Sequence, residues 1–223
     1  MNALRERLPV LGCEQVGAYT LLRLDRGGLD AGVPGQFFML EAPRRVLPRP
    51  MSLCQAPPGE LAFLIDPVGP GTRALCALEI GEAIHVYGPL GNGFDVTVER
   101  PLLVAGGIGI APMPFLAEAL GNPPAVLGFR SARHAEAARL VPDATVVVEP
   151  QLVTELLPHD PRDVLACGPE PMLEAVRALV PRAQLAWEAP MACGYGGCYG
   201  CVVEREGRYV RLCIEGPVLQ DAA

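Results

Sequence analysis

Four cysteines near the C-terminal end carry the most specific chemistry in this sequence. Residues 191–201 read MACGYGGCYGC, and Cys193, Cys198 and Cys201 are followed by Cys213, which gives the spacing C-x4-C-x2-C-x11-C. Three close cysteines with one distant partner are a ligand set for a [2Fe–2S] cluster. The intervening glycines let the backbone wrap closely and point its N–H groups at the sulfurs. The spacing therefore predicts an iron–sulfur cluster.

Two other uses of these thiols remain open at this stage. A structural zinc site also takes four cysteines, but usually as two C-x2-C pairs, and only Cys198 and Cys201 form such a pair. Two disulfides are a further alternative. They fit poorly, because the N-terminal residues MNALRERLPV have no apolar core of a secretory signal and predict a reducing, cytoplasmic location. Cys13, Cys54 and Cys76 are interpreted as ordinary buried thiols.

Two glycine-rich turns indicate a dinucleotide site. In LLVAGGIGIAPM (102–113) an apolar run ends at Gly106, Gly107 and Gly109, before a helix start. Such a turn exposes backbone N–H groups that can bind a pyrophosphate, although glycines also serve tight packing alone. A second apolar run ends at Cys167, Gly168 and Pro169. Because ligands bind at the carboxyl ends of parallel strands, both turns are expected at one site, with Cys167 at a nicotinamide or merely packed.

A third pair of segments suggests a flavin diphosphate site. RPMS (49–52) offers a cation and a hydroxyl, and GPGT (69–72) offers a small-residue turn that opens a short helix over 71–78. Either turn alone is weak evidence, because such sequences are common. Next to a nucleotide-binding domain, they predict a flavin held between two domains.

The pattern of apolar runs divides the chain into three parts. Residues 1–98 contain short strands, such as 19–24, 35–40, 60–65 and 82–88, punctuated by glycine and proline, which predicts an antiparallel β-barrel. Residues 99–186 alternate apolar strands and helices, which predicts a parallel sheet covered by helices. Residues 187–223 lose the alternation and carry the cysteines. The fold class is therefore mixed β and α/β, with a small C-terminal cluster segment.

Composition excludes several classes of protein. Half of the 223 residues are hydrophobic, which indicates a folded globular chain, and no apolar run approaches the length of a membrane span. The net charge of −7 argues against binding to nucleic acid.

The order of these segments resembles the ferredoxin–NADP reductase superfamily. PGQF (34–37), RPMS, GT, GPLGNGF (88–94), AGGIGIAP and CGPEPML follow one another as in that superfamily, whose FAD-binding barrel precedes a nucleotide domain. The cysteine loop and the closing RLCIEGPVL are similar to those of the electron-transfer subunits of dihydroorotate dehydrogenase B. The resemblance covers nearly the whole chain.

The resemblance implies roles for particular residues. It assigns FAD to Arg49, Pro50, Met51 and Ser52, to Leu64, Ile65 and Asp66 on the next strand, and to Gly71 and Thr72 at the diphosphate. It assigns the cluster to Cys193, Cys198, Cys201 and Cys213. Many reductases have an aromatic residue at the position of Met51, where it covers the flavin, so the stacking here must be weaker or come from elsewhere.

The resemblance also implies a function. A partner catalytic subunit oxidises dihydroorotate at its own FMN in pyrimidine biosynthesis, and electrons reach NAD through the cluster and FAD, in a heterotetramer with two copies of each subunit. No residue of this chain is expected to act on dihydroorotate. The alternatives are a related reductase subunit that serves a hydrogenase or a glutamate-synthase-like partner, and a zinc-stabilised nucleotide-binding module.

Overall fold

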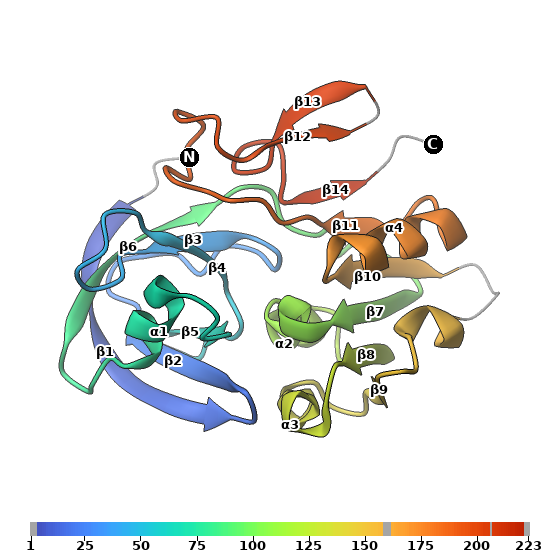
Figure 1. The fold of residues 1–223 in the computed structure, drawn as a ribbon, viewed down its shortest axis with the longest axis horizontal. Coiled ribbons are helices and arrows are strands. Elements are labelled where there is room, and N and C mark those ends of the chain that lie inside the picture. Colours follow the sequence, from blue (N-terminus) through green and yellow to red (C-terminus); the bar gives the residue numbers. More distant parts are fainter. Residues whose placement is uncertain (1–3, 158–161, 206, 221–223) are drawn as a thin grey trace.

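The computed structural model describes residues 4–157, 162–205 and 207–220 and divides them between two six-stranded sheets and a small hairpin (Figure 1). The first three residues of the N-terminal segment, where the sequence predicts no secretory signal, and the last three of the expected cluster segment lie outside the described residues. No helix in the described ranges is long and apolar enough to cross a membrane.

The first sheet is antiparallel throughout and has the strand order β4-β3-β6-β1-β2-β5. Its edge strands β4 and β5 contact each other, so the sheet curls into the expected barrel, with helix α1 beside it (Figure 1). Its interior is apolar and includes Leu22, Phe38 and Phe63. The elements are β1 (Leu4–Val16), β2 (Tyr19–Asp25), β3 (Phe37–Leu40), β4 (Arg49–Ser52), β5 (Glu60–Ile65), α1 (Pro70–Cys76) and β6 (Ala83–Leu90).

The second sheet has the order β14-β11-β10-β7-β8-β9, in which only the pairing of β14 with β11 is antiparallel. Its strands are β7 (Pro101–Gly106), β8 (Ala125–Phe129), β9 (Thr145–Val148), β10 (Asp163–Cys167), β11 (Gln184–Ala186) and β14 (Val218–Gln220). The helices are α2 (Met113–Ala119), α3 (Ala132–Ala135) and α4 (Glu170–Leu179), with 3-10 turns η1 (Gly107–Ile110), η2 (Glu136–Leu140) and η3 (Val153–Leu156).

Alternate residues of the central strand β7 face two different cores. Leu103 and Ala105 pack with α2 and with the side of the barrel near Tyr19. Leu102 and Val104 pack with α4 and with residues of the cysteine segment, including Cys201 and Cys213. The sheet is therefore covered on both faces, as its apolar strands predicted.

The segment between β11 and β14, residues 187–217, is called the cluster lobe here. Its described residues, 187–205 and 207–217, contain the hairpin β12 (Val202–Arg205) and β13 (Arg208–Arg211) and all four cysteines of the predicted cluster. The lobe lies across the top of both sheets (Figure 1). Since β14 pairs with β11, the lobe begins and ends at the edge of the second sheet.

Of the three thiols expected to be buried in the barrel region, only Cys54 is fully buried. Cys13 is exposed and not buried, because it follows the irregularity between Val10 and Gly12 in β1. Strand β1 itself was not predicted, since Pro9 and Gly12 interrupt its pattern. Of the other two thiols expected to be buried, Cys54 is buried and Cys76 is only half-buried.

Candidate functional site

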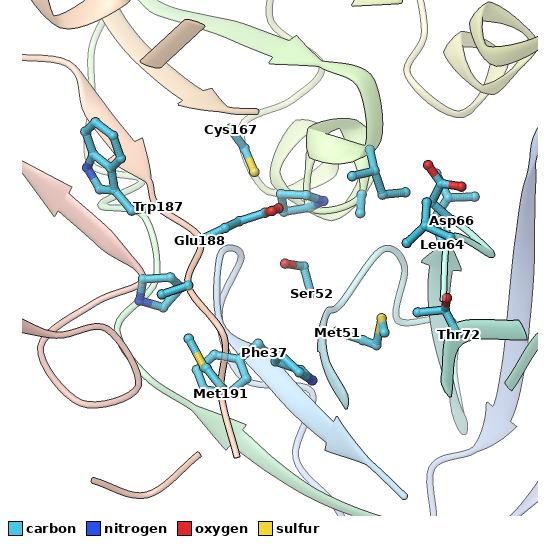
Figure 2. A pocket seen from close by; sticks show the side chains of 17 residues that line it. Phe37, Met51, Ser52, Leu64, Asp66, Thr72, Cys167, Trp187, Glu188 and Met191 are labelled. Atoms are coloured by element: carbon cyan, nitrogen blue, oxygen red, sulfur yellow. The ribbon is translucent and has the colours of Figure 1, made fainter. Parts of the chain in front are cut away.

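A cavity of about 260 Å³ lies between the barrel, the second sheet and the start of the cluster lobe (Figure 2). The barrel contributes side chains from three expected flavin segments, including Ser52, Leu64 and Thr72. The second sheet contributes Cys167, and the lobe contributes Glu188. The cavity is also lined by Phe37, Pro50, Met51, Asp66, Val68, Ile108, Ala111, Pro112, Trp187, Ala189, Met191 and Pro217.

The two expected flavin-binding turns lie in contact with each other. A Cβ atom on Gly71 would meet the guanidinium of Arg49, so Arg49 of β4 packs directly on the first turn of α1. The hydroxyl of Thr72 accepts a hydrogen bond from the N–H of Gly69 at 3.0 Å and donates one to its carbonyl at 3.2 Å, which fixes this turn. The guanidinium also donates to the carbonyls of Leu47 and Pro48. These contacts build a small cationic cradle beside the cavity.

The last two residues of β5 and the residue directly after the strand alternate in direction. Leu64 and Asp66 line the cavity, whereas the side chain of Ile65 is fully buried in the interior of the barrel. This alternation is the ordinary period of a strand. Of the three residues expected at the flavin, the structure therefore brings the side chains of two to the cavity.

The two glycine-rich turns interlock at the carboxyl ends of β7 and β10. A Cβ on Gly109 would meet the backbone of Cys167 and of Gly168, and a Cβ on Gly106 would lie 2.6 Å from the sulfur of Met172. Gly107 has a φ of +55°, which favours glycine. Only glycine allows the two turns to approach this closely.

A second cavity of about 520 Å³ opens beside these turns. Gly106, Gly107 and Pro169 line it, and Asp66 and Ile108 line both this cavity and the first. The two cavities therefore adjoin at Asp66 and Ile108. Arg130, at the end of β8, also lines the second cavity and donates to Nε2 of His134 at 2.9 Å.

Glu188 was not identified from the sequence, although it follows the carboxyl end of a buried strand, where ligands are expected. Its side chain points into the middle of the first cavity, between Cys167 and Ser52 (Figure 2). The carboxyl is open to the cavity, but dense protein around it raises its pKa above the ordinary value. Burial, and then the charge of Glu188, raise the pKa of the Cys167 thiol. Each group therefore holds its proton more strongly than it would in water.

The four cysteines of the cluster lobe lie as two pairs. The sulfurs of Cys201 and Cys213 are 3.2 Å apart, and all eight cysteines of the chain are free thiols, which is contrary to the disulfide alternative. In the other pair, hydrogen bonds from Gly200 and from Cys193 lower the pKa of Cys198 to about 7. Within the described ranges, no three His, Cys, Asp or Glu side chains gather as a single-ion site requires. Two pairs suit the two irons of a [2Fe–2S] cluster better than one zinc ion.

The cysteine pairs differ in exposure. Cys201 and Cys213 are buried in the core shared with the second sheet, whereas Cys193 is half-buried and Cys198 is exposed. Backbone N–H groups point at the outer sulfurs, from Gly197 to Cys193 at 3.3 Å and from Gly200 to Cys198 at 3.4 Å. Such donors stabilise thiolate charge. The donor set and its N–H groups therefore fit an iron–sulfur cluster with one pair near the surface.

Comparison with solved structures defines the class of fold. A chain from the structure of an NADH-dependent reduced ferredoxin–NADP oxidoreductase superposes with a TM-score of 0.84 over 99% of this chain and 90% of that chain, at 22% identity. Phthalate dioxygenase reductase superposes with a TM-score of 0.66 over 81% of this chain and 64% of that chain, at 18% identity. The fold is that of the ferredoxin–NADP reductase class.

Comparison of sequences gives the family within that class. Residues 188–222 match the iron–sulfur cluster binding domain of dihydroorotate dehydrogenase B. The dihydroorotate dehydrogenase B (NAD(+)) electron transfer subunit of Clostridium perfringens is 34% identical, over 91% of this chain and 89% of that protein. The subunit of the same name from Listeria monocytogenes is 35% identical, over 84% of this chain and 85% of that protein. The chain belongs to the family of dihydroorotate dehydrogenase B electron transfer subunits.

Proposed function

We propose that this chain couples the oxidation of dihydroorotate, carried out by a partner subunit in pyrimidine biosynthesis, to the reduction of NAD. When bound, FAD exchanges a hydride with a nicotinamide and single electrons with an iron–sulfur cluster, so it can stand between the two. In this proposal the barrel, residues 1–98, binds FAD, the second sheet and its helices, residues 99–186, bind NAD, and residues 187–223 bind the cluster. The last of these segments also returns β14 to the second sheet.

The residues of the chain hold and orient these groups. Arg49, Gly71 and Thr72 form the cradle for the flavin diphosphate, and Met51, Ser52, Leu64 and Asp66 line the flavin cavity. Gly106, Gly107 and Pro169 of the interlocked turns line the second cavity, where the dinucleotide would bind, and Gly109 and Gly168 are buried where the two turns meet. Cys193, Cys198, Cys201 and Cys213 ligate the cluster. Phe37 also lines the cavity, whereas the ring of Trp187 points away from its middle and lies against the guanidinium of Arg205 (Figure 2).

The observation that carries the proposal is the course of the chain from the cavity to the cysteines. Glu188, Ala189 and Met191 line the cavity, and Cys193 follows after one further residue. A single short stretch of backbone therefore joins the flavin cavity to the first cluster ligand. A short separation between the flavin cavity and Cys193 is needed for electron transfer, whereas a zinc-stabilised binding module would not require it.

The partner is proposed to be an FMN-containing subunit that oxidises dihydroorotate, with two copies of each subunit in the complex. Among the described residues, the outer pair, half-buried Cys193 and exposed Cys198, is the part of the cysteine site that a partner could approach. A cytoplasmic location is part of the proposal, since eight free thiols suit a reducing compartment.

The test begins with the chain purified under anaerobic conditions. We expect about two irons, two acid-labile sulfides and one FAD per chain. Adding the dihydroorotate-oxidising subunit should then yield NADH from dihydroorotate and NAD. A colourless protein that binds zinc, and takes up neither flavin nor cluster on reconstitution, would refute the proposal. A loaded chain that serves only a hydrogenase or a glutamate-synthase-like partner would reassign the partner.

A further inference from the structure

One side chain of the barrel strand β6 and one of the turn after it each donate a hydrogen bond to the cluster lobe, and the backbone N–H of Asn92 in that turn also donates to the carbonyl of Gly216. The hydroxyl of Tyr87 donates a hydrogen bond to the carbonyl of Cys193 at 3.0 Å, and the side-chain amide of Asn92 donates to the carbonyl of Glu215 at 3.0 Å. Cys193 is the first expected ligand, and Glu215 lies two residues after the last, Cys213. The two side-chain hydrogen bonds therefore bracket the segment that contains all four cysteines.

The same part of the barrel forms one wall of the flavin cavity. Met39 of β3 lies opposite Tyr87 of β6, and Phe37, two residues earlier on the same face of β3, lines the cavity. Two residues of a strand span about 7 Å. Met39, at the contact with the cluster lobe, and Phe37, in the cavity wall, are therefore neighbours on one face of β3.

The contact between this support and the lobe is close. Gly194, next to Cys193, has a φ of +78°, and a Cβ placed on it would lie 2.7 Å from Cγ of Met39 and 3.1 Å from Leu90. The backbone of the lobe thus rests directly on the barrel. The hydrogen bond from Tyr87 to the adjacent carbonyl of Cys193 also prevents this backbone from sliding along the barrel surface.

The hydrogen bond of Tyr87 supports the cysteine pair that is less buried, Cys193 and Cys198. Cys201 and Cys213 are anchored in an apolar core, whereas Cys193 is half-buried and Cys198 is exposed. The ordinary pKa of a tyrosine hydroxyl is about 10, well above neutral pH. The hydroxyl therefore keeps its proton and remains a donor at neutral pH.

We propose that Tyr87 and Asn92 are positioning residues that hold the two ends of the cysteine segment on the barrel and so set its separation from the flavin cavity. Neither residue touches the reacting atoms. This inference rests on the proposed function, because the separation matters only if electrons pass between the two sites.

The test compares Tyr87→Phe with Tyr209→Phe, which removes a hydroxyl from a ring that is 79% exposed on the same lobe. Both variants are loaded with FAD and cluster, and amide hydrogen exchange is measured over residues 191–198. Reduction of the cluster after mixing with NADH is followed by stopped flow. We expect Tyr87→Phe to speed exchange of this segment and slow cluster reduction, each by about threefold to tenfold, the equilibrium effect of one hydrogen bond.

Two further measurements separate positioning from general damage. Reduction of a small dye by NADH, which needs the flavin but not the cluster, should be unchanged in Tyr87→Phe. Asn92→Ala should speed exchange over residues 212–217 and leave residues 191–198 as in the wild type. If Tyr87→Phe matches Tyr209→Phe in both exchange and cluster reduction, the positioning role is refuted. If the wild-type chain itself has no cluster that NADH reduces, the proposed function fails instead.

Discussion

Replacing Gly109 with alanine tests how closely the two glycine-rich turns must approach. Its Cβ would lie 2.5 Å from the carbonyl carbon of Cys167 and 2.6 Å from Cα of Gly168, and it would also meet the carbonyl oxygen of Cys167. All three atoms belong to the backbone, so no side-chain rotation relieves the clash, and the turns must move apart. Overpacking of this kind costs about 1–3 kcal/mol. For a chain of this size, that lowers Tm by roughly 2–12 °C.

The same movement should damage the dinucleotide site. Displacing a binding turn by about 1 Å can lower a reaction rate by about a hundredfold. We therefore expect slow reduction of bound FAD by NADH in stopped flow, while chemical reduction by dithionite and the iron content remain as in the wild type. The matched control is Gly12→Ala, because a Cβ at Gly12 meets nothing within 4 Å. A Gly109→Ala protein with the Tm and NADH kinetics of this control would refute the reasoning.

Three further predictions concern the cavity and its surroundings. The dense protein around Glu188 raises its pKa, so the native state binds this proton more strongly than the unfolded state does. The free energy of unfolding should therefore fall as pH rises above about 4.5, by a small amount because the carboxyl is open to the cavity. Glu188→Gln should remove this part of the pH dependence in urea unfolding, and an unchanged profile would contradict it. Gly71→Ala should push the Arg49 guanidinium aside and weaken FAD binding by about threefold to tenfold, as the loss of one hydrogen bond would; equilibrium dialysis showing wild-type affinity would be the contrary result. Arg205 lies 3.7 Å from the ring centre of Trp187, so Arg205→Met should cost about 0.5–2 kcal/mol of stability, and calorimetry with no shift in Tm would oppose this.

Local patterns in the sequence predicted much of the fold. The strands β2 and β5 and the alternation from β7 to α4 follow directly from apolar runs and their punctuation. Strand β1 escaped prediction because Pro9 and Gly12 interrupt its pattern, yet pairing with β6 and β2 on its two sides overrides this local signal. The return of β14 to the second sheet depends on a partner far away in the chain, which no local pattern reveals.

The candidate site divides in the same way. The cysteine spacing and the glycine turns are local signals, and both could be recognised before the structure. Glu188 and Tyr87 were missed, because their significance depends on what they face across the fold: a cavity in one case and the carbonyl of Cys193 in the other. For Ile65 the reverse applies, since motif position suggested a flavin contact and strand alternation turns its side chain inward.

The antiparallel pairing of β11 with β14 has a consequence for how this protein could be taken apart. Ala186 lies opposite Val218, so residues 187–217 are, in topological terms, one long hairpin connection. A designer could try to excise them and close the hairpin with a short turn, to leave a plain flavin reductase. The deletion would also remove Trp187, Glu188, Met191 and Pro217, which wall the cavity. The cluster lobe is therefore an insertion by topology, yet it also forms part of the wall of the cavity, so it cannot be removed without opening that cavity.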